Sequence, residues 1–170
     1  MINDYIGTWH GDLDQYKEWN QVVKMNPDKP MVPSEFGLCE PAFAGGDTRR
    51  NEIFLEKMTC YRKYPNIAGT IYFCLNDYRT QMGEEGEGKL RQRVHGSTDL
   101  CGNPKPSYHT VARECAPVIL EKEGTKVKVT CRDNLPCYTV KGYQLVAVNG
   151  EKREQISIPT LLPGMSWPTE

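Results

Sequence analysis

Long hydrophobic runs and an excess of charge of one sign are both missing from this chain. Its longest apolar run, residues 67–75, is far shorter than the roughly 20 residues that a membrane-spanning helix needs. The 21 Lys and Arg nearly balance the 22 Asp and Glu, so no basic field favours nucleic acid or an anionic membrane. We therefore expect neither kind of partner. The opening residues 1–4 lack the features of a signal peptide. The compartment stays open, because any export signal would lie upstream.

Motifs for metals, phosphates and several hydrolase chemistries are missing as well. The seven cysteines contain no C-x-x-C pair, which favours reduced structural thiols over a metal centre. The chain has no phosphate-binding glycine loop, no H-E-x-x-H pair and no Ser-x-x-Lys motif. The sequence therefore predicts no metal site and no cofactor.

Residues 1–115 alternate strand and helix signals, which is typical of an α/β fold with parallel strands. The expected strands are residues 5–9, 30–35 and 67–75, and the last is apolar enough to be covered on both faces. Apolar residues at helical spacing predict the helices. The first covers residues 13–23 and begins at an Asp12 cap. The second is capped by Asp47 or Thr48, with its apolar stripe over residues 54–61, and the third covers residues 107–115. Residues 79–103 are expected to form one long loop.

The pattern changes at about Pro117. Residues 126–131 alternate with period two, as a half-exposed strand does. Residues 144–148 and 153–158 flank Asn149-Gly150, which is a strong hairpin signal. Residues 117–170 therefore predict an antiparallel β domain of sandwich type. A complete immunoglobulin-like sandwich takes about 100 residues, so we expect only part of one.

The most distinctive local feature is a glutamate delivered by a short apolar run. Residues 31–33 lead to Glu35, and Gly37 ends the expected strand. In α/β barrels, catalytic side chains project from the carboxyl ends of the strands. Glu35 is therefore a candidate catalytic carboxylate. The alternative is an ordinary solvated glutamate at a strand end.

Further motifs follow in order along the chain. They are Ser34-Glu35-Phe36-Gly37 behind Asp28-Lys29-Pro30, then Gly69-Thr70-Ile71-Tyr72-Phe73, Asn76-Asp77-Tyr78-Arg79-Thr80 and Gly102-Asn103-Pro104-Lys105-Pro106. Each is weak by itself. In order and spacing together they resemble glycoside hydrolase family 2, which contains β-galactosidases, β-glucuronidases and β-mannosidases.

The resemblance implies the C-terminal portion of a TIM (β/α)8 barrel. Residues 1–115 would hold its last three β/α units, and residues 117–170 the start of the immunoglobulin-like β-sandwich that follows it. Glu35 would be the nucleophile of a retaining β-glycosidase, β-galactosidase-like, acting on a carbohydrate substrate. Retaining enzymes need a second carboxyl group about 5–5.5 Å away, which in this family follows an asparagine.

The second carboxyl group has no convincing candidate. The one Asn-Glu pair, Asn51-Glu52, falls in the first turn of an expected helix, where we expect it to face solvent. The isolated chain is therefore expected to be inactive. It should also be oligomeric or dependent on the missing barrel half, because open sheet edges and bare apolar surface promote association.

The resemblance also implies carbohydrate-binding residues. Trp9 and His10 would end the first strand on the same rim as Glu35, and they depart from a family pattern in which a tyrosine near this point hydrogen-bonds the nucleophile. Phe73 falls where the family commonly has a sugar-stacking tryptophan. Asp77 and Arg79 begin the last loop and are expected to pair with each other. The alternatives are ordinary packing for the aromatic residues and a rim ion pair of little value for the charged ones.

Other functions stay open. One is a non-catalytic carbohydrate-binding or interaction module, and another is a complete small doubly wound domain in which Glu35 is structural. A third is a β-glucuronidase-type parent. β-Glucuronidases of this family carry an Asn-x-Lys signature that residues 92–96 lack, although Arg91, Arg93 and His95 offer positive charge toward an acidic sugar.

Overall fold

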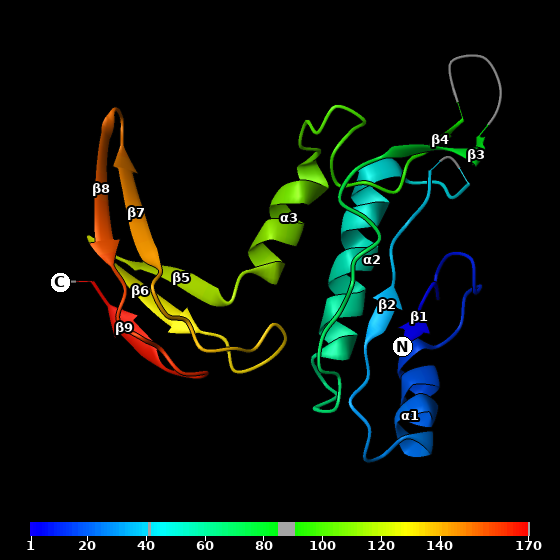
Figure 1. Cartoon of the computed structure of the whole chain (residues 1–170), viewed down its shortest axis with the longest axis horizontal. Helices are drawn as coiled ribbons and strands as arrows, with labels where there is room; N and C mark the ends of the chain where they lie inside the picture. Colours follow the sequence, from blue (N-terminus) through cyan, green and yellow to red (C-terminus); the bar gives the residue numbers. More distant parts are fainter. Residues whose placement is uncertain (41, 85–90, 170) are drawn as a thin grey trace. The chain divides into compact units, whose positions relative to one another are not determined.

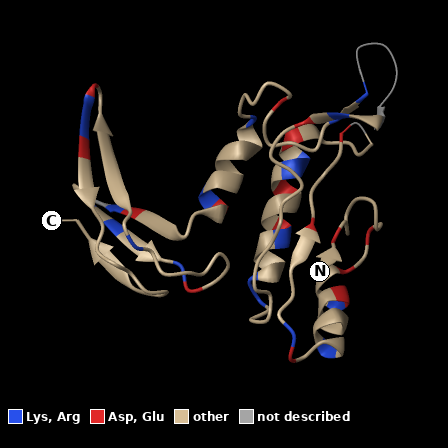
Figure 2. Cartoon of the chain, viewed as in Figure 1, with Lys and Arg blue, Asp and Glu red and all other residues tan. Residues whose placement is uncertain are grey.

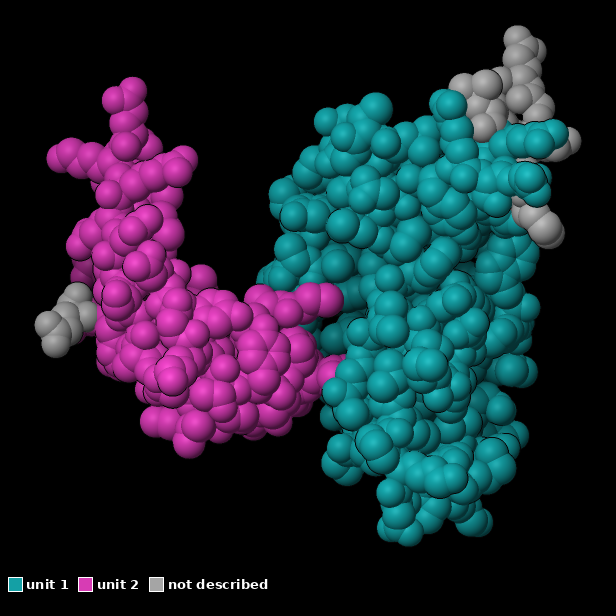
Figure 3. Space-filling view, in the orientation of Figure 1, with its two compact units in different colours: residues 1–114 teal, residues 115–170 magenta. Residues whose placement is uncertain are grey.

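The computed structural model describes residues 1–40, 42–84 and 91–169 (Figure 1). The chain divides into two compact units, residues 1–114 and 115–170 (Figure 3). Within the described residues, no helix is both long enough and apolar enough to cross a membrane.

Parallel strands lie at the centre of the first unit. β1 (Ile2–Asn3) pairs with β2 (Pro33–Glu35), with Asn3 opposite Glu35. The predicted strand at residues 5–9 is wrong, because β1 ends at Asn3 and residues 6–10 form turns. Residues 5–9 have the apolar and aromatic character of a strand, but the pairing with the short β2 ends before them.

Residues 67–75 run parallel to β2 on its other side, as an irregular segment rather than a regular strand. The amide of Ala68 donates to the Met31 carbonyl at 2.9 Å, and the amide of Phe73 donates to the Phe36 carbonyl at 3.1 Å. The expectation that this run is covered on both faces is wrong. Ile71 is 52% exposed and Leu75 58% exposed, so about half of each of these two residues is left uncovered by the described residues.

Three helices accompany these strands. α1 (Gln15–Met25) is capped by Asp14, two residues later than predicted, whose carboxylate accepts from the amides of Tyr16 and Lys17. It ends before Pro27, as predicted. α2 (Gly46–Tyr61) and α3 (Pro106–Cys115) confirm the other two predicted helices, although the cap of α2 is Gly45, two residues before the predicted Asp47. Lys, Arg, Asp and Glu all lie along α2 (Figure 2).

The core of the first unit forms around Phe36, which is fully buried directly after Glu35. Its ring contacts those of Phe54, Tyr61 and Tyr72 at centroid distances of 5.8, 5.3 and 5.6 Å. Gly37 follows at a φ of +152°, and a side chain there would collide with the Phe73 carbonyl oxygen. This close approach explains why the strand that carries Glu35 breaks at a glycine.

Part of the predicted long loop at residues 79–103 is instead a β-ribbon, while residues 94–103 form no helix or strand. β3 (Tyr78–Glu84) pairs antiparallel with β4 (Gln92–Arg93). The remainder of that prediction includes residues 85–90, which lie outside the described residues.

The second unit is antiparallel throughout. Its sheet has the order β5-β6-β9, and β7 and β8 form a separate hairpin. The strands are β5 (Val118–Glu123), β6 (Lys126–Cys131), β7 (Gln144–Asn149), β8 (Lys152–Ser157) and β9 (Ser166–Pro168). The predicted strands near 126–131, 144–148 and 153–158 are confirmed, and Gly150 in the predicted turn has a φ of +61°. β5 and β9 were not predicted.

Candidate active site

Glu35 ends β2, and its carboxylate is held by a phenol. The Tyr5 hydroxyl donates to Glu35 Oε2 at 3.1 Å. The Glu35 main chain is fixed as well, because its carbonyl accepts from the Asp4 amide at 2.7 Å. Both contacts follow from the parallel pairing of β1 and β2, which brings their carboxyl ends to the same edge of the sheet. Glu35 is thus a half-buried carboxylate with a fixed direction.

Tyr5 is a candidate site residue that the sequence prediction missed. Burial, followed by the neighbouring charge of Glu35, raises the pKa of the Tyr5 phenol well above its usual value, so the phenol keeps its proton and remains a donor. The available signal is the tyrosine that the resemblance implies near this point of the sequence. The predicted strand at residues 5–9 instead makes Tyr5 a strand residue, whereas the structure places it just after β1.

Trp9 and His10 do not end a strand, so that prediction is wrong. They lie in the turn after β1, where their contacts differ. His10 Nδ1 accepts from the Tyr5 amide at 3.2 Å, which brings His10 to the residue that binds Glu35. Trp9 is half-exposed and packs edge-on against Phe43 at 4.7 Å between ring centroids.

Phe73 belongs to an aromatic cluster with Tyr78 and His95. The Phe73 ring lies 5.9 Å from Tyr78 and 5.1 Å from His95 between centroids, and the Tyr78 and His95 rings stack. Burial raises the pKa of Tyr78, and the charge of Glu35 contributes in the same direction.

His95 does not supply positive charge, contrary to the sequence-based interpretation. Burial, and then the nearby Arg93 and Arg50, lower the pKa of His95 to about 4. The ring is therefore neutral at pH 7. It packs as an uncharged ring against Phe73 and Tyr78 and is only 5% exposed.

Asp77 and Arg79 do not pair with each other. Asp77 accepts from Lys105 Nζ at 2.8 and 2.9 Å and from the Gly96 amide at 2.8 Å, whereas Arg79 lies exposed on β3. Lys105 Nζ also donates to the Gly96 carbonyl at 3.0 Å. The pair therefore joins the segment after residue 75 to the loop that carries His95, and Asp77 is a scaffold residue.

Replacing Lys105 by methionine should destabilise the first unit by about 3 kcal/mol, because it leaves the Asp77 carboxylate buried without its cation. Side-chain exposures of 6% for Asp77 and 19% for Lys105 justify treating the pair as largely buried. Urea unfolding at pH 7 measures the effect, with Lys29→Met as a control at an exposed lysine. Equal unfolding midpoints for the two variants would show that the Asp77–Lys105 pair does not stabilise the first unit.

Asn51-Glu52 lies in the second turn of α2, one turn later than predicted. The Glu52 side chain is 53% exposed and pairs with Arg49 at 3.1 Å. Within residues 1–40, 42–84 and 91–169, no group of three or more His, Cys, Asp and Glu side chains gathers in a way that would hold a metal ion.

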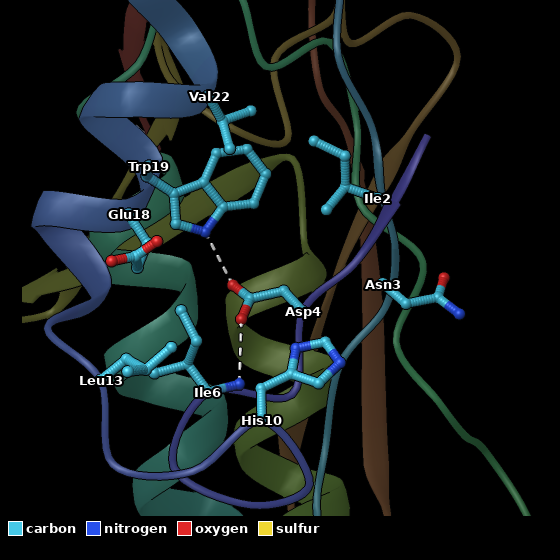
Figure 4. A pocket seen from close by; sticks show the side chains of 9 residues that line it. All are labelled: Ile2, Asn3, Asp4, Ile6, His10, Leu13, Glu18, Trp19 and Val22. Carbon is cyan, nitrogen blue, oxygen red and sulfur yellow. Dashed lines mark hydrogen bonds between the residues drawn. The ribbon is translucent and has the colours of Figure 1, made fainter.

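A pocket lies beside β1 and α1 (Figure 4), and Glu35 is not among its lining residues. Its walls come from β1, the following turn and α1. They are Ile2, Asn3, Asp4, Ile6, His10, Leu13, Glu18, Trp19 and Val22. The Asp4 carboxylate at its inner wall receives bonds from Trp19 and Ile6 (Figure 4).

No protein-family model and no curated protein matches this chain. The solved structures that are similar to it include two β-glucuronidases. A β-glucuronidase from Bacteroides uniformis matches with a TM-score of 0.56 and 15% identity, over 98% of this chain and 25% of the enzyme. A β-glucuronidase from Faecalibacterium prausnitzii matches with a TM-score of 0.50 and 21% identity, over 65% of this chain and 20% of the enzyme.

The likeness is one of fold. At these identities it shows a glycosidase-like fold and nothing about residues or substrate. The chain spans a quarter or less of the length of the enzymes that it resembles.

Proposed function

We propose that this chain carries the nucleophile portion of a retaining β-glycosidase, with Glu35 as the nucleophile. The observation that carries the proposal is the Tyr5–Glu35 hydrogen bond at the carboxyl end of paired parallel strands. A carboxylate held there by a neutral donor stays oriented, and the phenol also stabilises its charged form. The glycosidase-like fold of the chain supports the same chemistry.

The proposed reaction has two displacements. A Glu35 carboxylate oxygen attacks the anomeric carbon while the bond to the leaving-group oxygen breaks, and that oxygen takes a proton from a second carboxyl group. Water, deprotonated by the same second group, then displaces Glu35 from the covalent ester. Phe73 and Tyr78 are half-buried aromatic rings packed against the neutral, buried His95, and such rings suit the C–H face of a sugar.

The second carboxyl group would come from protein outside these residues, since Glu52 faces solvent from α2. The isolated chain should therefore not hydrolyse glycosides. It should also self-associate, because the segment at residues 67–75 has an uncovered side that includes Ile71 and Leu75. A monomer by light scattering would contradict that expectation.

That uncovered side also bears on the alternative of a complete doubly wound domain, which needs cover on both faces of its sheet. Ile71 and Leu75 favour the fragment instead. A non-catalytic carbohydrate-binding module remains the competing function, and it predicts sugar binding without covalent chemistry at Glu35.

We propose a β-glycoside as the substrate. β-Galactosides are the first candidate, because the sequence motifs favour a β-galactosidase-like enzyme. β-Glucuronides are the second candidate, because both solved structures described above are β-glucuronidases. A neutral His95 supports the first, since it offers no charge to a sugar carboxylate.

The test is mechanism-based labelling of the full-length protein that contains this chain. The 2-deoxy-2-fluoro-β-galactosyl and β-glucuronyl fluorides should each be tried, because the fluorine slows hydrolysis of the covalent ester enough for peptide mass spectrometry. We expect the matching sugar to label Glu35. A label on another carboxylate, or sugar binding without any label, would overturn the assignment.

Replacing Tyr5 by phenylalanine should lower the labelling rate and kcat by about 10- to 100-fold. A hydrogen bond to a charged group contributes about 1.5–3 kcal/mol, which corresponds to the expected loss of rate. Tyr64→Phe, on an exposed phenol that contacts α1, is the matched control and should change neither quantity.

A further inference from the structure

Asp4 is a buried carboxylate that the proposed chemistry does not use directly. It is 3% exposed and follows β1. Its oxygens accept from Lys57 Nζ at 2.6 Å, Trp19 Nε1 at 2.7 Å and the Tyr61 hydroxyl at 2.8 Å. Asp4 thereby ties the end of β1 to both α1 and α2.

The same residue holds both sides of Tyr5. Asp4 directly precedes Tyr5, and its carboxylate also accepts from the Ile6 amide at 3.2 Å (Figure 4). Its own amide donates to the Glu35 carbonyl at 2.7 Å. One residue thus fixes the main chain on either side of the phenol and the main chain of the carboxylate that the phenol binds.

We propose that Asp4 is the positioning residue through which α1 and α2 fix the Tyr5–Glu35 pair. The inference rests on the proposed function. It explains why a charged residue is buried at this position. Stability alone does not require the charge, because replacing a buried ion pair by well-packed hydrophobic groups often causes no loss of stability. An apolar residue could fill the space at Asp4, but it could not accept the bonds that fix the direction of the chain before Tyr5.

The test compares four forms of the full-length protein: wild type, Asp4→Asn/Lys57→Met, Tyr5→Phe, and all three changes together. The paired substitution removes both buried charges, so no charge is left uncompensated. The measured quantity is the first-order rate constant for labelling of Glu35 at saturating fluorosugar. Glu18→Gln, on the same pocket beside Trp19, is the control and should behave as wild type.

We expect the Asp4→Asn/Lys57→Met rate to fall by about tenfold, and the triple variant to be no slower than Tyr5→Phe alone. Non-additivity of this kind is the signature of two residues that act through one contact. A purely structural Asp4 would lower the unfolding temperature and slow both backgrounds equally, which would overturn the proposal. If the paired substitution prevents folding, Tyr61→Phe removes one of the bonds to Asp4 and keeps the ring, and it should show the same dependence on Tyr5.

A second measurement needs no substrate and separates this inference from the proposed function. The side-chain carboxyl carbon of Glu35 is observed by NMR at pH 7 in protein labelled with ¹³C at glutamate. We expect its chemical shift to move in the same direction in Asp4→Asn/Lys57→Met and in Tyr5→Phe, because both changes disturb the Tyr5–Glu35 hydrogen bond. If wild-type Glu35 is not labelled by either sugar, the proposed function fails. If Asp4→Asn/Lys57→Met leaves the chemical shift unchanged, the positioning role fails.

Discussion

Replacing Glu35 by glutamine should lower kcat/KM for an aryl β-glycoside by at least about 10³-fold in the full-length protein, because a neutral amide is a far weaker nucleophile than a carboxylate. The loss should appear in kcat as well, since bond formation to the anomeric carbon takes place in the transition state. Folding should be little affected, because Glu35 is only half-buried and the Tyr5 hydroxyl can donate equally well to an amide oxygen.

Rescue of activity by azide, in a variant that lacks the carboxylate, distinguishes a nucleophile from other essential carboxylates. In Glu35→Ala, azide can enter the space that the side chain vacates and form a bond to the anomeric carbon while the aryloxide leaves. Because Glu35 itself attacks from the face opposite the leaving group, the product should be the α-glycosyl azide. A β-glycosyl azide would instead identify Glu35 as the acid/base residue.

Glu52→Gln is the matched control, because it changes another glutamate of the same unit that lies on the exposed face of α2. We expect wild-type activity from it. If Glu52→Gln were inactive and Glu35→Gln active, the proposed roles of the two residues would be wrong. That outcome would direct attention to the Asn51-Glu52 pair.

The strand that carries Glu35 could be predicted because its signals are local. An apolar run, a carboxylate and a glycine lie within eight residues, and the glycine is required by the close approach of the Phe73 carbonyl. The partner of Glu35 could not be found in the same way. Tyr5 contacts it across thirty residues of sequence, and a shift of the first strand by a few residues hid that contact.

The pairing of buried charged residues is the second feature that could not be predicted from the sequence. Lys57 lies in α2 next to the apolar stripe, and its spacing suits an exposed lysine as well as a buried one. Its partner Asp4 is 53 positions away. The same holds for Asp77, whose nearby Arg79 suggested an ion pair, whereas the structure pairs it with Lys105. Hydrophobic periodicity locates helices, but it does not say which charge meets which across the fold.

The largest expected stability effect concerns the buried Asp4–Lys57 pair. Replacing Lys57 by methionine should lower the free energy of unfolding by about 3–5 kcal/mol at pH 7, because it leaves the Asp4 carboxylate charged and buried without its cation. The side chains of Asp4 and Lys57 are each only 2% exposed, so water cannot replace the lost partner. Urea unfolding followed by circular dichroism and tryptophan fluorescence measures the change.

The size of this effect should depend on pH in a definite direction. Burial raises the pKa of Asp4, but Lys57, Trp19 and Tyr61 together hold it below its usual value. A carboxyl with a depressed folded pKa stabilises the protein above its unfolded pKa of about 3.9. That contribution is lost as the pH falls through the folded value. Without Lys57, burial dominates and the pKa of Asp4 should rise, so the carboxyl becomes neutral at a higher pH.

The gap in stability between wild type and Lys57→Met should therefore be widest near pH 7 and narrow toward pH 4, where the variant no longer buries an unpaired charge. Asp4→Asn/Lys57→Met should recover most of the stability at pH 7, since it removes both charges together. A gap that stays constant between pH 7 and pH 4 would mean that lost packing, and not the uncompensated Asp4 carboxylate, destabilises the variant. In that case the double variant would be no more stable than Lys57→Met, and α2 would hold β1 by apolar contact alone.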